Sequence, residues 1–331
     1  MNKTVFLDTL AKLRESVSPE LTRAHEIMHE VATTAPGSLS KYLVELVARK
    51  GKRMRATFVL LIASSGREKS VERSALISAS IELLHLATLV HDDIIDGSDM
   101  RRNGMTAHKK WGPRIAVLIG DFALSKALEL IINEKDRRIP QSISRAASRL
   151  IAGEIQEIEL SGNLDLTADE YFEVIYGKTA SLWETCGECG ALLAGFDDET
   201  VGKCTRLGKN MGMAFQIIDD LLDYGIGAED LGKEVNTDLQ NGLITLPLIF
   251  FFQNNDQGKT SEMKSLLNST PDKPGNRRVI ELLDETGSFK KTKEMAIEKI
   301  NYCMNTINEF PRSRYFEYLI ELCEIMLHRS A

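Results

Sequence analysis

The hydrophobic positions of this chain recur at steps of three and four residues. This spacing gathers apolar side chains on one face of an α-helix. It is clearest in the leucines and valine between Leu83 and Val90. It is also seen at Ile151, Ile155 and Ile158 and at Leu182, Leu192 and Leu193. No segment alternates convincingly with a period of two, and no βαβ order is evident. The pattern therefore predicts an all-α fold with about ten or more helices.

Proline and glycine divide the chain into helical segments. The stretches 37–112 and 141–246 contain no proline, so they can hold long helices. Residues 254–288 are polar and predict loops around short helices, and the chain is expected to be helical again from Lys290. We predict a single domain over residues 1–331, with a core at 45–250 that carries the motifs and with C-terminal helices and loops at 251–331.

Composition and charge narrow the class of protein. The 331 residues are 43% hydrophobic and 27% charged with a net charge of −7, which excludes a disordered chain and disfavours nucleic-acid binding. The odd count of five cysteines suggests a reducing compartment, and the lone pair Cys186 and Cys189 is a weak zinc signal. No apolar run approaches the roughly 18 to 20 residues that a membrane span needs. The expected location is the cytoplasm.

Two aspartate clusters could carry chemistry. Asp92, Asp93 and Asp96 form one Asp-Asp-x-x-Asp motif, and Asp219, Asp220 and Asp223 form the other. Residues i and i+4 share a helix face, so each cluster presents paired carboxylates. Because aspartate is a poor helix former, propensity does not explain three of them at what the pattern predicts to be a helix centre. One such motif alone could be a solvated acidic face, whereas two with aliphatic neighbours favour a metal site.

Carboxylate oxygens without histidine or cysteine are the ligands that Mg²⁺ prefers. Mg²⁺ is usually held by a few carboxylates together with substrate phosphates, so two facing clusters indicate a diphosphate or a similar polyanion between them. On the first helix, a stripe about 80° wide runs from apolar to acidic. It consists of Ile81, His85, Thr88, Asp92 and Asp96. On the second helix, Gly208 and Gly212 indicate either close helix packing or room for a ligand.

Basic residues that could match a polyanion lie near these clusters. They are Lys52 and Arg55 before an apolar helix at 56–63, Arg101 and Arg102 after the first cluster, Lys178, and Lys233. A single basic cluster is usually a solvated face. Acidic and basic groups together are explained by one metal-bridged phosphate site.

The ordered set of motifs resembles the trans-isoprenyl diphosphate synthase, or polyprenyl synthetase, family over residues 50–250. It includes Gly51–Arg55, Leu84–Asp96, Arg101–Gly104, Gly120-Asp121, Gly153-Glu154 with Gln156, Lys178–Ala180, Gln216–Asp223, Gly232-Lys233, Thr237–Leu239 and Thr245–Pro247. The resemblance implies one large helical bundle of the isoprenoid synthase type with a central cavity. It also implies condensation of isopentenyl diphosphate with an allylic prenyl diphosphate, and a homodimer.

The resemblance also implies roles for individual residues. The six aspartates would hold several Mg²⁺ ions, three with substrate bound, which clamp the allylic diphosphate. Arg101, Lys178 and Lys233 would contact that diphosphate. Thr179 and Gln216 would face the developing carbocation. The isopentenyl diphosphate would be bound by Lys52, Arg55, His85 and Arg102. In the family the released diphosphate takes the proton, so no protein base is assigned.

Two positions depart from the family pattern. Leu243 stands where lysine is usual, and Asn236 stands where glycine is usual. We expect activity with weaker binding of the allylic diphosphate.

The residues that precede Asp92 on the same predicted helix give some indication of product length. Ala87 and Thr88 lie roughly 6 to 8 Å below the metals at 1.5 Å per residue. In the family, aromatic residues there block the tunnel in short-chain enzymes. Both residues are small here, so the product is expected to be longer than C15 farnesyl diphosphate. Phe122, Leu124 and Leu128 are candidates for the floor of the tunnel.

Two alternatives stay open from the residues alone. One is a class I terpene cyclase or head-to-head prenyl synthase, although cyclases generally lack the second aspartate motif and the Lys52–Arg55 site. The other is a regulatory subunit, although such a subunit is expected to lose its aspartates.

Overall fold

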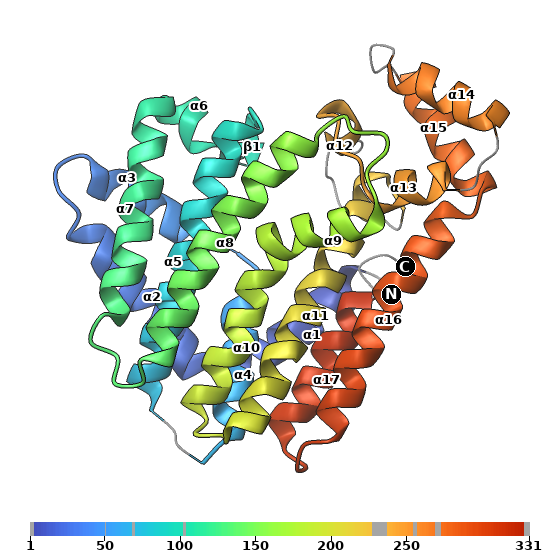
Figure 1. Cartoon of the computed structure of the whole chain (residues 1–331). Helices are drawn as coiled ribbons and strands as arrows, with labels where there is room; N and C mark the ends of the chain where they lie inside the picture. The colour runs from blue at the N-terminus through green and yellow to red at the C-terminus, as the bar shows by residue number, and fades with distance from the viewer. Residues whose placement is uncertain are drawn as a thin grey trace.

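The computed structural model describes residues 3–49, 51–67, 70–101, 104–226, 237–253, 257–268 and 273–327, and these form a helical bundle (Figure 1). The first half contains α1 (Lys3–Glu15), α2 (Ser18–Thr33), α3 (Leu39–Ala48), α4 (Met54–Ser65), α5 (Val71–Ile95), α6 (Ala107–Trp111), α7 (Pro113–Ile131) and α8 (Arg138–Leu160). The second half contains α9 (Ala168–Ile175), the π-helical turn η1 (Tyr176–Ala180), α10 (Ser181–Leu193), α11 (Asp198–Asp223), α12 (Thr237–Gln240), α13 (Leu246–Phe252), α14 (Gln257–Leu267), α15 (Lys273–Glu285), α16 (Ser288–Asn308) and α17 (Arg314–Leu327). The predicted all-α class is confirmed. The strands described are β1 (Met100–Arg101) and β2 (Gly104–Met105), which pair antiparallel after α5.

The long helices α5 and α11 form the centre of the bundle. α5 packs against α2, α4 and α7, and α11 packs against α10 and α16. Gly208 and Gly212 serve close packing, because a Cβ at Gly208 would lie 2.1 Å from the Trp183 carbonyl oxygen and one at Gly212 would lie 2.6 Å from the Cα of Ala180. Of the two readings of these glycines, the structure therefore supports helix packing.

α5 corrects the expectation that no apolar segment is long enough for a membrane span. Its 25 residues include a window with mean hydropathy 1.4, which meets the length and composition of a span. However, 67% of that window is buried in the bundle, as in a core helix. The sequence reading missed it because His85 and Glu82 interrupt the apolar run.

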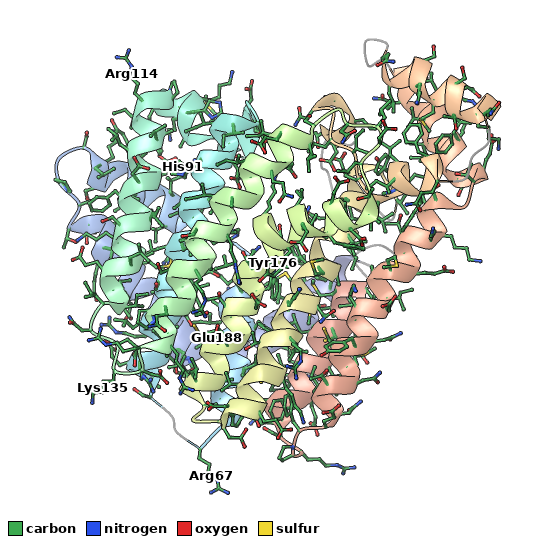
Figure 2. The ribbon with its side chains drawn as sticks, in the orientation of Figure 1. Arg67, His91, Arg114, Lys135, Tyr176 and Glu188 are labelled. Carbon is green, nitrogen blue, oxygen red and sulfur yellow. The ribbon has the colours of Figure 1, made fainter. Side chains whose placement is uncertain are left out.

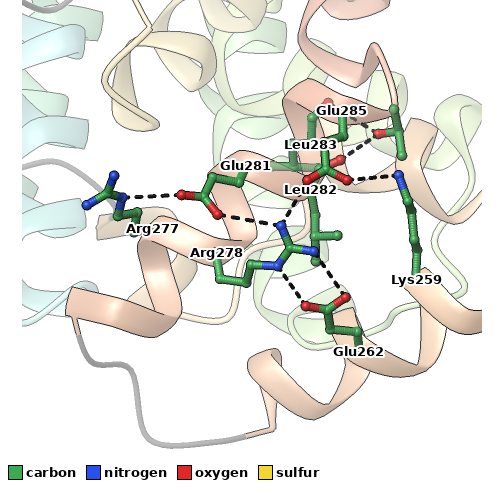
Figure 3. Close-up of polar contacts among 9 residues, drawn as sticks. Lys259, Glu262, Arg277, Arg278, Glu281, Leu282, Leu283 and Glu285 are labelled. Atoms are coloured by element: carbon green, nitrogen blue, oxygen red, sulfur yellow. Dashed lines mark hydrogen bonds and ion pairs between the residues drawn. The ribbon is translucent and has the colours of Figure 1, made fainter.

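The polar segment at 254–288 contains two helices longer than expected. α14 and α15 form a hairpin beside α13 and α16 (Figure 1). Arg278 joins the two helices through Glu262 at 2.7 Å and also contacts Glu285 at 2.9 Å (Figure 3). Exposed pairs of this kind contribute little, so the apolar residues Met263 and Leu282, both 0% exposed, anchor the hairpin.

Candidate active site

Both aspartate clusters lie at C-terminal ends of helices, so the prediction of a helix centre is wrong. α5 ends at Ile95 with Asp96 as its C-cap, and α11 ends at Asp223. β1, which follows α5, and α12, which follows α11, lie at the same end of the bundle (Figure 1). A helix C-terminus carries partial negative charge, so carboxylates there are disfavoured unless cations balance them.

Within each cluster the aspartates differ in burial. Asp93 and Asp220 are each 4% exposed, whereas Asp92, Asp219 and Asp223 are half-buried and Asp96 is exposed. Asp93 accepts a hydrogen bond from Arg101 Nε at 2.5 Å. Arg101 was predicted to contact a diphosphate, and its guanidinium is here paired with the cluster itself.

Asp220 belongs to a chain of side-chain hydrogen bonds. Thr179 Oγ1 donates to Gln216 Oε1 at 2.7 Å, and Gln216 Nε2 donates to Asp220 Oδ1 at 2.7 Å. Tyr171, which is 3% exposed, donates its hydroxyl to Asp220 Oδ2 at 2.5 Å. The chain fixes the orientation of the Gln216 amide and of the Asp220 carboxylate.

Asp223 fixes the segment that follows the second cluster. Its Oδ1 accepts from the Thr237 hydroxyl at 2.5 Å, and its Oδ2 accepts from the Asp238 backbone N–H at 2.9 Å. Asp223 therefore caps the start of α12. This contact holds Asp238, which the resemblance included without a role, beside the second cluster.

Lys178 lies between the two clusters. Its ammonium pairs with Glu157 and lies 3.3 Å from Glu154 Oε2 on α8. Burial alone would lower the pKa of Lys178, but Glu157, Glu154 and Asp92 outweigh it and raise that pKa above its usual value. Lys178 also acts electrostatically on Asp238, so it links the α5 carboxylates with those around α11. Gly153 and Gly177 make this possible, because a Cβ at Gly153 would lie 2.3 Å from the Lys178 backbone nitrogen.

Two carboxylates of the site, Asp92 and Asp220, have strongly raised pKa values. Burial, together with repulsion from Glu154, raises the pKa of Asp92 to about 7. Burial raises the pKa of Asp220 to about 7 against the opposing hydrogen bonds from Tyr171 and Gln216. Divalent cations beside these carboxylates would remove the cost of ionising them.

The donor set fits Mg²⁺ together with a bound anion. Among the described residues, no three carboxylate, histidine or cysteine side chains form a group that could hold a metal ion. Ions there would therefore need oxygens from a ligand, which is the usual situation for Mg²⁺ and phosphates. The buried Glu154 Oε1 has no hydrogen-bond partner, which leaves one more oxygen at this site that an ion or its water could satisfy.

Arg55, in the first turn of α4, lies close to α5, whereas Lys52, just before α4, lies against α1. Arg55 Nη1 lies 3.2 Å from His85 Nε2, and the Arg55 guanidinium lies over the rings of Trp183 and Phe215 at 5.4 and 5.7 Å. Lys52 Nζ lies 4.9 Å from the centroid of the Phe6 ring on α1. His85 is about 10 Å along α5 from Asp92, at 1.5 Å per residue. Arg102, Lys233 and Asn236 lie outside the described residues.

Along the wall before Asp92, exposure to solvent rises in the same direction as the polarity of the residues. Ile81 is 0% exposed, His85, Thr88 and Asp92 are half-buried, and Asp96 is exposed. His91, next to this stripe, instead points to α7, where its Nε2 lies 3.2 Å from the Val117 carbonyl oxygen (Figure 2).

The candidate chain-length residues lie on α5 and α7. Ala87 is 2% exposed in the main hydrophobic core, and Thr88 donates its hydroxyl to the His85 carbonyl. Phe122, Leu124 and Leu128 are partly buried on α7 against that core.

A pocket of about 540 Å³, including space open to solvent, adjoins the second cluster. Its polar wall contains Lys178, Asp220 and Asp238, and its apolar wall contains Leu243 and Ile244. Leu243 therefore places an aliphatic side chain in the pocket that Lys178 and Asp220 share.

The sequence analysis missed two groups at this site, Tyr171 and Glu157, and it named Asp238 only within a family motif, without a role. Tyr171 has an apolar helical spacing that is typical of core residues, and its hydroxyl partner is 49 positions away. The only available signal for Glu157 was its position three residues after Glu154, on the same helix face.

The chain is similar in sequence and in fold to known proteins. A family model described as polyprenyl synthetase matches residues 36–283. The chain is 35% identical over 292 residues to an all-trans-nonaprenyl-diphosphate synthase (geranyl-diphosphate specific) of Rhodobacter capsulatus, covering 88% of each chain. It is 31% identical over 326 residues to octaprenyl diphosphate synthase of Escherichia coli, covering 97% of this chain and 99% of that one. A polyprenyl synthase of Caulobacter crescentus, solved with calcium and isoprenyl diphosphate, superposes with a TM-score of 0.89 at 29% identity over 98% of both chains.

Proposed function

The chain belongs to the polyprenyl synthetase family, and we propose that it condenses isopentenyl diphosphate with an allylic prenyl diphosphate to give a linear all-trans product longer than C15. The observation that carries this proposal is the pair of aspartate clusters linked by Lys178. Six clustered carboxylates, of which Asp92, Asp93 and Asp220 have raised pKa values, lie near a buried ammonium and need cations and a polyanion, and an allylic diphosphate with Mg²⁺ supplies both.

The first step is loss of the allylic diphosphate. Asp92, Asp96 and Asp219 would hold Mg²⁺, which neutralises the charge that develops on the leaving group. Asp93, Asp220 and Asp223 accept hydrogen bonds from protein donors, so they would act mainly by orienting the two clusters. The Lys178 ammonium would shift from Glu157 toward the diphosphate and add a direct positive charge.

The second step is attack by the isopentenyl double bond. Lys52, Arg55 and His85 would hold the isopentenyl diphosphate, together with Arg102. The Thr179 and Gln216 oxygens, fixed by their mutual hydrogen bond, would face the allylic cation and stabilise it. The released diphosphate would then accept the proton, so the reaction needs no protein base. Lys233 and Arg101 would complete the allylic diphosphate site.

We also propose a homodimer formed through α8 and a cytoplasmic location. Ile151, Ile155 and Ile158, whose spacing predicted a helix, are 54%, 52% and 54% exposed. An apolar stripe of this kind on a helix surface favours contact with a second copy of the chain.

Incubation with isopentenyl diphosphate, farnesyl diphosphate and Mg²⁺, with product length measured by mass spectrometry, tests the function. We expect prenyl diphosphates extended in C5 steps beyond C15. A cyclised or head-to-head product, or no consumption of isopentenyl diphosphate, would refute it.

A further inference from the structure

The backbone turns sharply just before α4. Arg53 has φ 51° and ψ 34°, and it is the one non-glycine residue of the described chain with positive φ. A left-handed conformation is unfavourable for an L-residue other than glycine, so the surroundings must stabilise it. Lys52 precedes this residue, and Arg55 follows two positions later.

A buried ion pair holds Arg53 in place. Its Nη1 donates to Glu82 Oε2 at 2.8 Å, and its Nη2 donates to the Val47 carbonyl oxygen at 3.4 Å. The side chains of Arg53 and Glu82 are 21% and 8% exposed. Breaking a pair this buried leaves an uncompensated charge, so the pair strongly favours one position of the turn.

The same glutamate caps α4. Arg53 is the N-cap residue of α4, and its side chain makes no capping hydrogen bond. Instead, Glu82 Oε1 accepts from the Ala56 backbone N–H at 3.3 Å. Glu82 therefore uses one oxygen for the Arg53 side chain and the other for the first turn of the helix. It attaches α4 to α5 at the turn that carries Lys52 and Arg55.

Glu82 also lies close to the other half of the basic site. It precedes His85 by three residues, so both lie on one face of α5. Arg55 contacts His85 at 3.2 Å. Two neighbouring contacts thus join the turn to α5. One is the ion pair of Arg53 with Glu82, and the other is the contact of Arg55 with His85, two residues assigned to substrate binding.

We propose that Arg53 and Glu82 are positioning residues, which set the spacing of Lys52, Arg55 and His85 for the homoallylic diphosphate. This inference rests on the proposed function. The pair acts on the substrate only through those three residues. Loss of the pair should therefore weaken the binding of isopentenyl diphosphate selectively and leave the allylic site intact.

Glu82→Gln is the sharpest test. Glutamine replaces one of the two carboxylate oxygens by an NH2 donor and removes the charge, so Arg53 and the Ala56 N–H no longer each face an acceptor oxygen of their own. Arg53→Met removes the charge at similar length, and Arg53→Lys retains it. The matched control is Glu134→Gln, because Glu134 is 5% exposed and accepts from both the Arg73 side chain and the Asp136 backbone N–H. Arg73 lies near the opposite end of α5 from Asp92.

Steady-state kinetics with isopentenyl and farnesyl diphosphates, together with thermal melting, give the readout. We expect Glu82→Gln and Arg53→Met to raise KM for isopentenyl diphosphate about tenfold and to change KM for farnesyl diphosphate less than about twofold. Arg53→Lys should recover most of the affinity. Glu134→Gln should lower the melting temperature and leave both KM values unchanged.

Three outcomes would overturn the inference. They are equal rises in both KM values, an unchanged KM in a folded Glu82→Gln protein, and a Glu134→Gln protein with the same selective defect. If Arg53→Met does not fold, the Glu82→Gln and Arg53→Lys proteins still decide the question. An unaltered chain that does not consume isopentenyl diphosphate would refute the proposed function instead.

Discussion

Tyr171→Phe tests whether the hydrogen bond to Asp220 supports the second aspartate cluster. The change removes one hydroxyl that donates to Asp220 Oδ2 at 2.5 Å, and leaves Gln216 as the donor to the other oxygen. A hydrogen bond to a charged group contributes about 1.5 to 3 kcal/mol. At about 2 °C per kcal/mol for a large domain, the melting temperature should fall by about 3 to 6 °C. The melt should be recorded at pH 8, above the pKa of about 7 for Asp220, so that the carboxylate is charged.

The same change should alter catalysis through the pKa of Asp220. The Tyr171 hydrogen bond lowers that pKa, so its removal should raise it further. The acidic limb of the pH–rate profile should then move to higher pH, and more Mg²⁺ should be needed for half-maximal activity at pH 7.

Tyr224→Phe is the matched control for this prediction. Tyr224 is also 3% exposed, but its hydroxyl pairs with the neutral Thr245 hydroxyl at 3.0 Å. A neutral hydrogen bond contributes about 0.5 to 1.5 kcal/mol, so this variant should melt closer to the unaltered protein and keep its Mg²⁺ dependence. Equal effects of the two changes on melting and on Mg²⁺ dependence would refute the reasoning.

Four further predictions concern the substrate sites, the metal and the assembly. Leu243→Lys should strengthen binding of the allylic diphosphate, because it adds an ammonium to the pocket beside Lys178; equilibrium binding that shows no gain would contradict this. Ala87→Phe should shorten the products, and an unchanged chain-length distribution by mass spectrometry would reject the tunnel assignment. The pKa of Asp92 is about 7 in the fold and 3.8 ordinarily, so between these pH values the metal-free folded state binds more protons than the unfolded state. The contribution of Asp92 to the free energy of unfolding of the metal-free protein therefore falls as pH rises. Mg²⁺ should then raise the melting temperature more at pH 8 than at pH 6, and equal shifts in a thermal melt would contradict this sign. Ile155→Glu should yield a monomer by light scattering if α8 forms the dimer contact, whereas an unchanged mass would exclude that face.

The helices could be predicted because their signal is local. Apolar spacing and the distribution of proline identified the all-α fold and the long helices. The two aspartate clusters were wrongly expected at helix centres, because apolar residues flank both of them. The correcting signals were present, since Gly97 and Gly225 have positive φ just beyond Asp96 and Asp223.

The site was predictable in its residue types and less so in their contacts. Adjacent aspartates differ by about 100° around a helix, so tertiary packing decides that Asp93 is buried while Asp92 is only half-buried. Tyr171 and Glu157 reach the site through helix packing that no local pattern specifies. Conversely, Ile151, Ile155 and Ile158 have the spacing of a buried face, but periodicity cannot distinguish the core of one chain from a surface that a second copy covers.

The most direct test of the account is a crystal structure with Mn²⁺ in place of Mg²⁺ and a non-ionisable analogue of farnesyl diphosphate, with the metals located by anomalous scattering. The account predicts metal peaks beside Asp92 and Asp96 and beside Asp219, with the diphosphate between them and Lys178 turned toward it. Metals at only one cluster, or a diphosphate bound away from both, would contradict it.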